Sequence, residues 1–218
     1  VCVYDRAGYG WSEPSKRPRT ANVMADELHT LLQTSGEKPP YIVVGHSFGG
    51  FNALMFAHLF PGGVAGIVLV DSMHPDMHSG SRLTEKLWLT AMQMAVPFGL
   101  PRWRNLCGVR AEGEFATTTC RSRFYRAIVR EWDAVPKSAE QVREIKNVGS
   151  IPLLVITRDP ALGEGAAHEN LERTFLPLSS QSQFIVAEGS GHDVPMARPD
   201  VVIDAVKRLV KPQAPAGN

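Results

Sequence analysis

Short apolar runs alternate along the chain with longer amphipathic segments, and this alternation constrains the fold more than any other feature. The runs are rich in β-branched or aromatic residues, and turn residues follow most of them, as is typical of buried strands. They are Val1–Tyr4, Tyr41–Val44, Gly66–Val70, Leu153–Thr157 and Gln183–Ala187. Strands separated by helices need crossover connections, which place a parallel sheet between two layers of helices. The pattern predicts an α/β fold with a doubly wound, mostly parallel sheet.

Four segments have the spacing of apolar residues that helices show. In Thr20–Ser35, Met24, Leu28 and Leu31 fall on one helical face, and Gly36 follows where the helix should end. The other three predicted helices are Phe48–Leu59, Glu164–Phe175 and Pro199–Val210.

Residues 72–149 break this rhythm, because their apolar residues (Leu83, Leu87, Trp88, Ala91 and Met92) have helical spacing and no strand-like run occurs. We therefore expect an α/β core formed by residues 1–71 and 150–218, with residues 72–149 as a helical cap inserted between two strands.

Composition narrows the function classes. The 218 residues include 23 Lys and Arg against 22 Asp and Glu, a net charge of +1, which gives no sign of a nucleic-acid binder. No apolar run approaches the roughly 18 residues that span a bilayer. Three cysteines cannot form a disulfide scaffold. Cys2 is expected in the core, and Cys107 and Cys120 as free thiols in preference to a pair.

The sharpest local motif is Gly45-His46-Ser47-Phe48-Gly49, which follows the run Tyr41–Val44 and precedes a predicted helix. A nucleophilic serine at the end of a strand sits in a strained turn, so small residues are needed on both sides of it. The N-terminus of the following helix would place the Phe48 N–H where it can stabilise an oxyanion. We therefore interpret Ser47 as a nucleophile.

A base for this serine is expected at the same edge of the sheet. Among seven histidines, His192 lies in Gly189-Ser190-Gly191-His192-Asp193, between the last strand and the last helix. Loops at the carboxyl ends of parallel strands are where α/β folds place their sites. His192 is the predicted general base, and His46, inside the serine motif, is expected beside the nucleophile and the substrate.

Two carboxylates could orient the base. Asp159 follows the strand Leu153–Thr157, and Asp71 ends the strand Gly66–Val70. Either one preserves the order serine, acid, histidine along the chain. We favour Asp159 as the orienting carboxylate, with Asp71 as the alternative.

Together these motifs resemble the α/β-hydrolase fold family. Asp5-Arg6-Ala7-Gly8-Tyr9-Gly10-Trp11-Ser12 is similar to the turn after that family's fourth strand, Val44–Gly50 to its nucleophile elbow, and Gly191-His192 to its histidine loop. The resemblance covers essentially the whole chain. It implies that Asp159 occupies the acid position after strand seven and Asp71 the position after strand six that some members use.

By this resemblance, the chain would be a serine hydrolase that cleaves an ester or a related acyl bond of a small molecule. Ser47 also separates it from the dehalogenase and epoxide-hydrolase branches, which use Asp at that position. The mechanism requires no metal or organic cofactor. The alternatives are a catalytically silent binding protein on the same fold, and an acyltransferase or cofactor-free peroxidase with the same triad.

Two features of the family have no counterpart before Val1: the first three strands and the loop that supplies a second oxyanion donor. We therefore expect the chain to be a fragment of a longer hydrolase, in which an export or anchor signal would precede Val1; the sequence assigns neither a compartment nor an oligomeric state.

Within the expected cap, Trp88 and Met92 are candidates for an acyl-binding pocket, although they could equally form the cap's own packing. The cap also carries a basic stretch, interpreted as a solvated helix in preference to an anion site: Arg102, Arg104, Arg110, Arg121, Arg123, Arg126 and Arg130.

Overall fold

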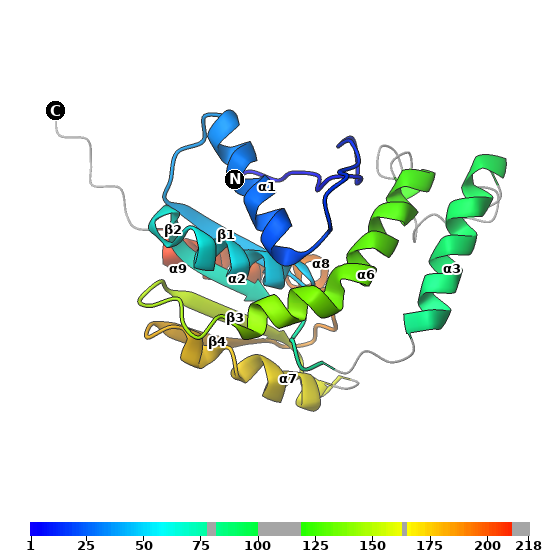
Figure 1. Ribbon diagram of the computed structural model, residues 1–218. Coiled ribbons are helices and arrows are strands. Elements are labelled where there is room, and N and C mark those ends of the chain that lie inside the picture. Colours follow the sequence, from blue (N-terminus) through cyan, green and yellow to red (C-terminus); the bar gives the residue numbers. More distant parts are fainter. Residues whose placement is uncertain (78–81, 100–118, 163–164, 211–218) are drawn as a thin grey trace. The chain divides into compact units, whose positions relative to one another are not determined.

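The computed structural model describes residues 1–77, 82–99, 119–162 and 165–210 (Figure 1). The chain divides into two compact units. Residues 1–23 and 78–137 form the helical unit, and residues 24–77 and 138–218 form the sheet unit. This division differs from the expected one, because residues 1–23 group with the helical insertion and not with the sheet.

The sheet unit contains the parallel sheet that the sequence predicts. Its strands are β1 (Tyr41–His46), β2 (Val64–Val70), β3 (Leu153–Arg158) and β4 (Ser182–Ala187), in the order β1-β2-β3-β4. All neighbouring pairs are parallel, with His46 beside Val70, Val70 beside Ile156 and Ile156 beside Ile185. The carboxyl ends of the strands therefore lie along one edge, where Ser47, Asp71, Asp159 and the loop of His192 follow them.

The prediction of a strand at Val1–Tyr4 is wrong. These four residues form no strand and are exposed, with Val3 at 92%. A strand exists only through hydrogen bonds to a neighbour, and this segment pairs with no strand of the described sheet. Cys2, expected in the core, is exposed with a free thiol.

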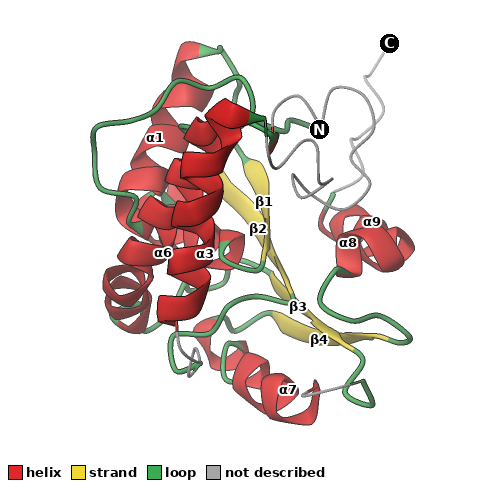
Figure 2. Cartoon of the chain, turned by 90° about the vertical axis from the view of Figure 1, so that its right-hand side faces the viewer, coloured by secondary structure: helices red, strands yellow, loops and turns green. Residues whose placement is uncertain are grey.

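Helices cover both faces of the sheet, as the connections require. They are α1 (Ala21–Thr34), α2 (Gly49–Leu59), α7 (Gly165–Arg173), α8 (Val194–Ala197) and α9 (Pro199–Leu209), with short 3-10 turns at Pro61–Gly63 and Leu176–Leu178. Figure 2 shows α8 and α9 on one side of the strands. On that side Val68, Val70, Leu154 and Ile156 pack against Val194 and Ala205. Because side chains alternate along a strand, Ile67, Leu69 and Val155 are buried on the other face.

The helical unit is built around α3 (Arg82–Ala95), the 3-10 turn Val96–Phe98 and the first part of α6 (Ser122–Arg143). Leu89 and Met92 of α3 are buried against Tyr125 of α6. Two arginines of α6 hold the loop near the start of the chain: Arg123 donates to the carbonyl of Gly10 at 2.5 Å, and Arg130 to that of Arg17 at 2.8 Å.

Two arginines of the basic stretch, Arg123 and Arg130, thus bind backbone carbonyls of this chain. Arg102, Arg104 and Arg110 lie outside the described residues. Cys120 is disulfide-bonded, which corrects the expectation of a free thiol there; Cys107 lies outside the described residues. Within the described ranges, the structure has no helix with the length and apolar character needed to cross a bilayer.

Candidate functional site

Ser47 sits at the strand-to-helix turn in a strained backbone conformation, with φ at +53°. Non-glycine residues rarely adopt such a positive φ, and those that do cluster at functional sites. The turn is tight: a Cβ on Gly45 would lie 2.3 Å from the carbonyl oxygen of Gly49, and one on Gly50 would lie 1.9 Å from Ser72 Oγ. A Cβ on Gly49 would meet nothing within 4 Å. On the C-terminal side of Ser47, the position that has no room for a side chain is therefore Gly50.

The N-terminus of α2 follows Ser47 directly. Phe48 has helical dihedral angles and no side chain caps the helix there. The first N–H groups of a helix have no acceptor within the helix, and the helix dipole favours negative charge at that end. The Phe48 N–H is therefore a suitable donor for an oxyanion formed at Ser47.

Asp71, one residue beyond β2, is the second described non-glycine residue with a positive φ, at +41°. Its backbone N–H donates to the carbonyl of Ile156 at 2.7 Å. The two strained turns are also tied to each other, because the N–H of Met73 donates to the carbonyl of Ser47 at 3.0 Å. Hydrogen bonds between neighbouring strand ends thus hold Ser47 and Asp71 in their unusual conformations.

His192 and Asp71 form the contact that defines the site. The carboxylate of Asp71 is completely buried, whereas the ring of His192 is 46% exposed and Nδ1 donates to Oδ2 of Asp71. Nδ1 is thereby occupied, which leaves Nε2 as the nitrogen available for proton transfer. No hydrogen bond joins Ser47 Oγ to His192 in the part of the chain that the structure describes; such bonds often form only in the substrate complex.

Arg158, at the end of β3, binds the same carboxylate in a bidentate manner. Its Nε lies 2.9 Å from Oδ1 of Asp71 and its Nη2 lies 2.6 Å from Oδ2. Burial alone would raise the pKa of Asp71, but the donors on His168, His192 and Arg158 outweigh it and hold that pKa far below its usual value. Asp71 is therefore ionised at neutral pH.

Asp159, favoured by the sequence analysis as the partner of His192, has a different role in the geometry. One carboxylate oxygen accepts from the Ala161 N–H and the other from the Gly189 N–H, both at 2.8 Å. These bonds lower the pKa of Asp159 and join its loop to the loop that carries His192. The preference for Asp159 is thus corrected, since its carboxylate caps backbone turns while that of Asp71 contacts His192.

His46, expected beside the nucleophile and the substrate, lies beside His192. Its Nε2 donates to the backbone carbonyl of His192 at 2.9 Å, and the two ring centroids are 4.7 Å apart. Burial is the main reason that the pKa of His46 is lowered, so the ring is neutral near pH 7. This contact helps to position the histidine loop; a substrate-binding role for His46 stays a prediction.

Two buried residues of α7 complete the surroundings of Asp71, and the sequence analysis assigned them no role. His168 Nε2 lies 3.1 Å from Oδ1 of Asp71 and 3.4 Å from Oε2 of Glu172. The only sequence signal is their spacing of four residues, which places two polar side chains on one helical face.

The ligand-type atoms of Asp71, His168 and Glu172 lie within 4.8 Å of one another, close enough for a metal ion. However, the guanidinium of Arg158 already neutralises Asp71 at hydrogen-bonding distance. A divalent cation would add to this positive charge in a buried place, so we interpret the cluster as a set of proton donors and acceptors.

The two cap candidates for substrate binding lie in the helical unit. Met92 is 6% exposed and belongs to the packing between α3 and α6, so it serves the internal core of that unit. Trp88 is 51% exposed and its ring meets that of Tyr125 edge-on; a substrate-binding role for Trp88 stays a prediction.

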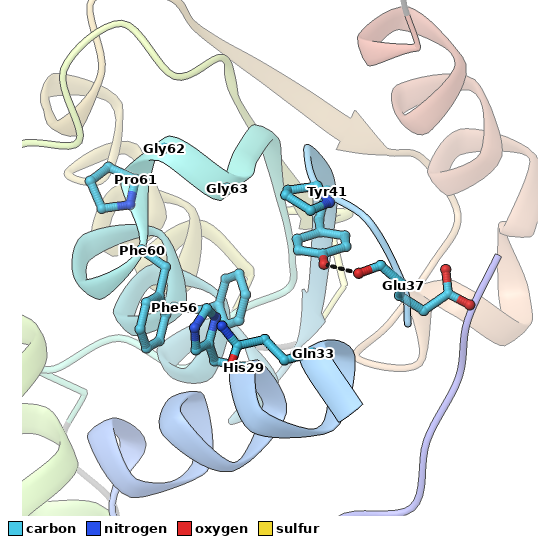
Figure 3. Close-up of a pocket in the computed structure, with 10 residues that line it drawn as sticks. His29, Gln33, Glu37, Tyr41, Phe56, Phe60, Pro61, Gly62 and Gly63 are labelled. Carbon is cyan, nitrogen blue, oxygen red and sulfur yellow. Dashed lines mark hydrogen bonds between the residues drawn. The ribbon is translucent and has the colours of Figure 1, made fainter. Parts of the chain in front are cut away.

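A cavity of about 380 Å³ lies at the opposite, amino-terminal end of β1 (Figure 3). Its wall is aromatic: the ring of His29 stacks on that of Phe60 at 3.8 Å, and Phe56 and Tyr41 lie beside them. Tyr41 donates its hydroxyl to the carbonyl of Glu37 at 2.8 Å. Because β1 separates this cavity from Ser47, it is not part of the site at the carboxyl ends of the strands.

Comparison with known proteins identifies the family and supports the fold. The model of the alpha/beta hydrolase family matches residues 1–205. An AB hydrolase superfamily protein of Gibberella zeae is 29% identical over 97% of this chain and 78% of its own length. Among solved structures, a thermophilic esterase from Thermogutta terrifontis matches with a TM-score of 0.65 and 20% identity, over 94% of this chain and 76% of the esterase. The epoxide hydrolase CorEH matches with a TM-score of 0.67 and 16% identity, over 94% and 79%.

Proposed function

We propose that this chain, which belongs to the alpha/beta hydrolase family, is a serine hydrolase that cleaves an ester or a related acyl bond. Ser47 is the nucleophile, His192 the general base and Asp71 the carboxylate that orients the base. Asp71 replaces Asp159 in this assignment because of the contacts described above.

The proposed reaction passes through an acyl-enzyme. His192 Nε2 takes the proton of the Ser47 hydroxyl while Oγ attacks the carbonyl carbon of the substrate, and the Phe48 N–H donates to the resulting oxyanion. His192 then gives the proton to the leaving alcohol. In the second half, His192 activates a water that attacks the acyl carbon and releases the acid and Ser47.

One observation carries the proposal: a half-exposed imidazole, held by a fully buried carboxylate, at the edge of the sheet where Ser47 occupies a strained turn. A buried ionised Asp stabilises the imidazolium that forms when His192 takes the proton of serine. An ordinary loop histidine needs neither this partner nor a neighbouring serine with a positive φ.

The chemistry of the nucleophile favours acyl transfer within the family. The solved relatives include both an esterase and an epoxide hydrolase, and at their level of identity they support the fold alone. In the epoxide-hydrolase branch the family resemblance implies an Asp at the position of Ser47. A serine there supports the esterase type of reaction.

The test is labelling with a fluorophosphonate, which reacts with activated serines, followed by mapping of the labelled peptide. We expect labelling at Ser47 in the wild-type protein and its loss in Ser47→Ala, with Ser12→Ala as the matched control that keeps the label. If the folded wild-type protein stays unlabelled under conditions that label a known esterase, the proposal is wrong and a binding role on the same fold is favoured.

A further inference from the structure

Glu172 is a fully buried carboxyl group directly behind the proposed triad. Its side chain is 0% exposed, and Oε1 accepts from the N–H of Ser72 at 2.6 Å. Ser72 follows Asp71, the residue held at positive φ. Glu172 therefore holds the turn on which the conformation of Asp71 depends. Its other oxygen, Oε2, lies 3.4 Å from Nε2 of His168, and a hydrogen bond with the side chain of Thr157 lowers the pKa of Glu172.

His168 lies between this carboxyl group and that of Asp71. Its Nε2 is at contact distance from an oxygen of each, 3.1 Å for Asp71 and 3.4 Å for Glu172, and the side chain is 5% exposed. With its other oxygen Asp71 binds His192. Asp71 thus has a histidine at each of its two oxygens, and only the one on the Ser47 side is half exposed.

Two carboxyl groups this close cannot both ionise cheaply in a buried place. Asp71 faces His168, His192 after β4 and Arg158 at the end of β3. Glu172 faces His168, Asp71 and the hydroxyl of Thr157 on β3, and His74 after β2 acts electrostatically on His168. Arg158 binds Asp71, so the negative charge is stabilised there. Burial, the largest effect, and the charge of Asp71 raise the pKa of Glu172 to about 7.

We propose that Glu172 and His168 are positioning residues for Asp71. Glu172 holds the Asp71–Ser72 turn by accepting the Ser72 N–H, and His168 lies between the two carboxyl groups, within contact distance of both. This inference rests on the proposed function, because it assigns a purpose to the orientation of Asp71.

The test combines the rate of fluorophosphonate labelling between pH 5.5 and 9 with the downfield NMR resonance of the His192 Nδ1 proton. Glu172→Gln keeps an acceptor for Ser72 and stays neutral, and Glu172→Leu removes the acceptor. The matched control is Glu169→Gln on the same helix, because Glu169 is paired with Arg173 at 2.5 Å, away from Asp71.

We expect Glu172→Leu to label about 10- to 100-fold more slowly and to lose or shift the resonance, because small misplacements of catalytic groups are costly. Glu172→Gln should match the wild type at pH 6. Above pH 7 the wild-type rate should decline as Glu172 ionises, whereas Glu172→Gln should keep its rate, so their ratio rises roughly tenfold.

The inference is overturned if Glu172→Gln and Glu172→Leu both show the resonance and the pH profile of Glu169→Gln, whatever their thermal stability, because such a result describes a packing residue. If Glu172→Leu does not fold, the pH profile of labelling in Glu172→Gln still decides whether Glu172 is a positioning residue. If no variant is labelled, wild type included, the proposed function fails, and the resonance, which needs no reaction, decides the positioning of Asp71 alone.

Discussion

Asp71 in the sheet unit and Glu131 in the helical unit are both buried carboxylates bound by an arginine, yet their surroundings differ. Glu131 accepts from Nε and Nη2 of Arg6 at 2.9 and 2.8 Å and from the hydroxyl of Tyr9 at 2.9 Å. Asp71 accepts from Arg158 in the same bidentate manner and, in addition, from a half-exposed histidine.

The difference shows what separates a structural ion pair from a candidate catalytic one. Around Glu131 the donors are a guanidinium and a phenol whose pKa is raised by burial and by the carboxylate, so none of them exchanges a proton near pH 7. Around Asp71 two of the contacts are imidazoles, His168 and His192, and imidazole is a side chain that can both accept and donate a proton in catalysis. Asp71 also has a positive φ and follows a central strand, beside Ser47.

The largest expected effect separates the two carboxylates by activity. Asp71→Asn should lower kcat/KM for a p-nitrophenyl ester about 10⁴-fold, because the amide holds His192 in the wrong tautomer. Glu131→Gln should change it less than about threefold, measured below the temperature at which it unfolds. Equal losses in the two variants would show that the contrast drawn here between the two carboxylates has no catalytic meaning.

The second effect concerns the stability that the Glu131 network gives to the helical unit. Removing one partner of a buried ion pair leaves the other charge uncompensated. Because Arg6 is 30% exposed, Glu131→Ala should lower the free energy of unfolding by about 2–4 kcal/mol in urea titration. Glu13→Ala, which removes a 90% exposed carboxylate 4.0 Å from Arg123, should cost about 0.5 kcal/mol or less. A cost for Glu131→Ala no larger than that control would mean that the network adds no stability.

The third effect concerns pH. The pKa of Glu172 is raised to about 7 in the folded protein from 4.5, so the unfolded chain binds fewer protons between these values. The stabilising contribution of the protonated form is complete below pH 4.5 and is lost as the pH rises through 7. The unfolding free energy of the wild type should fall relative to Glu172→Gln by on the order of 2–3 kcal/mol between pH 5 and 8. Parallel stability curves would contradict the shifted pKa.

The smallest effect tests the packing that holds the two strained turns together. A Cβ at position 50 would collide with Ser72 Oγ and Cβ, at 1.9 and 2.7 Å, whereas one at position 49 has free space. Gly50→Ala should therefore cost about 1–3 kcal/mol of unfolding free energy and slow the labelling of Ser47. Gly49→Ala should be neutral or slightly stabilising, since it begins a helix; a reversed order of the two would refute the packing argument.

Sequence patterns predicted much of the fold for physical reasons. Strands β1 to β4 and helices α1, α2, α7 and α9 lie within a few residues of the expected positions, because buried strands and amphipathic helices have distinct periodicities. The strand predicted at Val1–Tyr4 was wrong because apolar and β-branched residues show only that a segment favours the strand conformation. A strand also needs a neighbour with which to form hydrogen bonds.

For the candidate site, the sequence carries a signal where one local segment is involved, and none where distant segments meet. The spacing of Gly45, Ser47 and Gly49 indicates a tight turn by itself, although the neighbour that makes glycine necessary, Ser72, faces Gly50. The choice between Asp71 and Asp159 depends on which carboxylate meets His192 across two loops, and no local pattern encodes that. The proposed role of Glu172 likewise depends on its hydrogen bond with the Ser72 N–H, 100 residues away along the chain.

The central claim, that Asp71 and not Asp159 orients His192 for attack by Ser47, is tested most directly by the rate of fluorophosphonate labelling in Asp71→Asn and Asp159→Asn measured side by side. The account predicts that Asp71→Asn reacts about 10³- to 10⁴-fold more slowly than the wild type, while Asp159→Asn, which keeps one oxygen to accept a backbone N–H, stays within about tenfold. A large loss in Asp159→Asn together with near wild-type labelling in Asp71→Asn would contradict it.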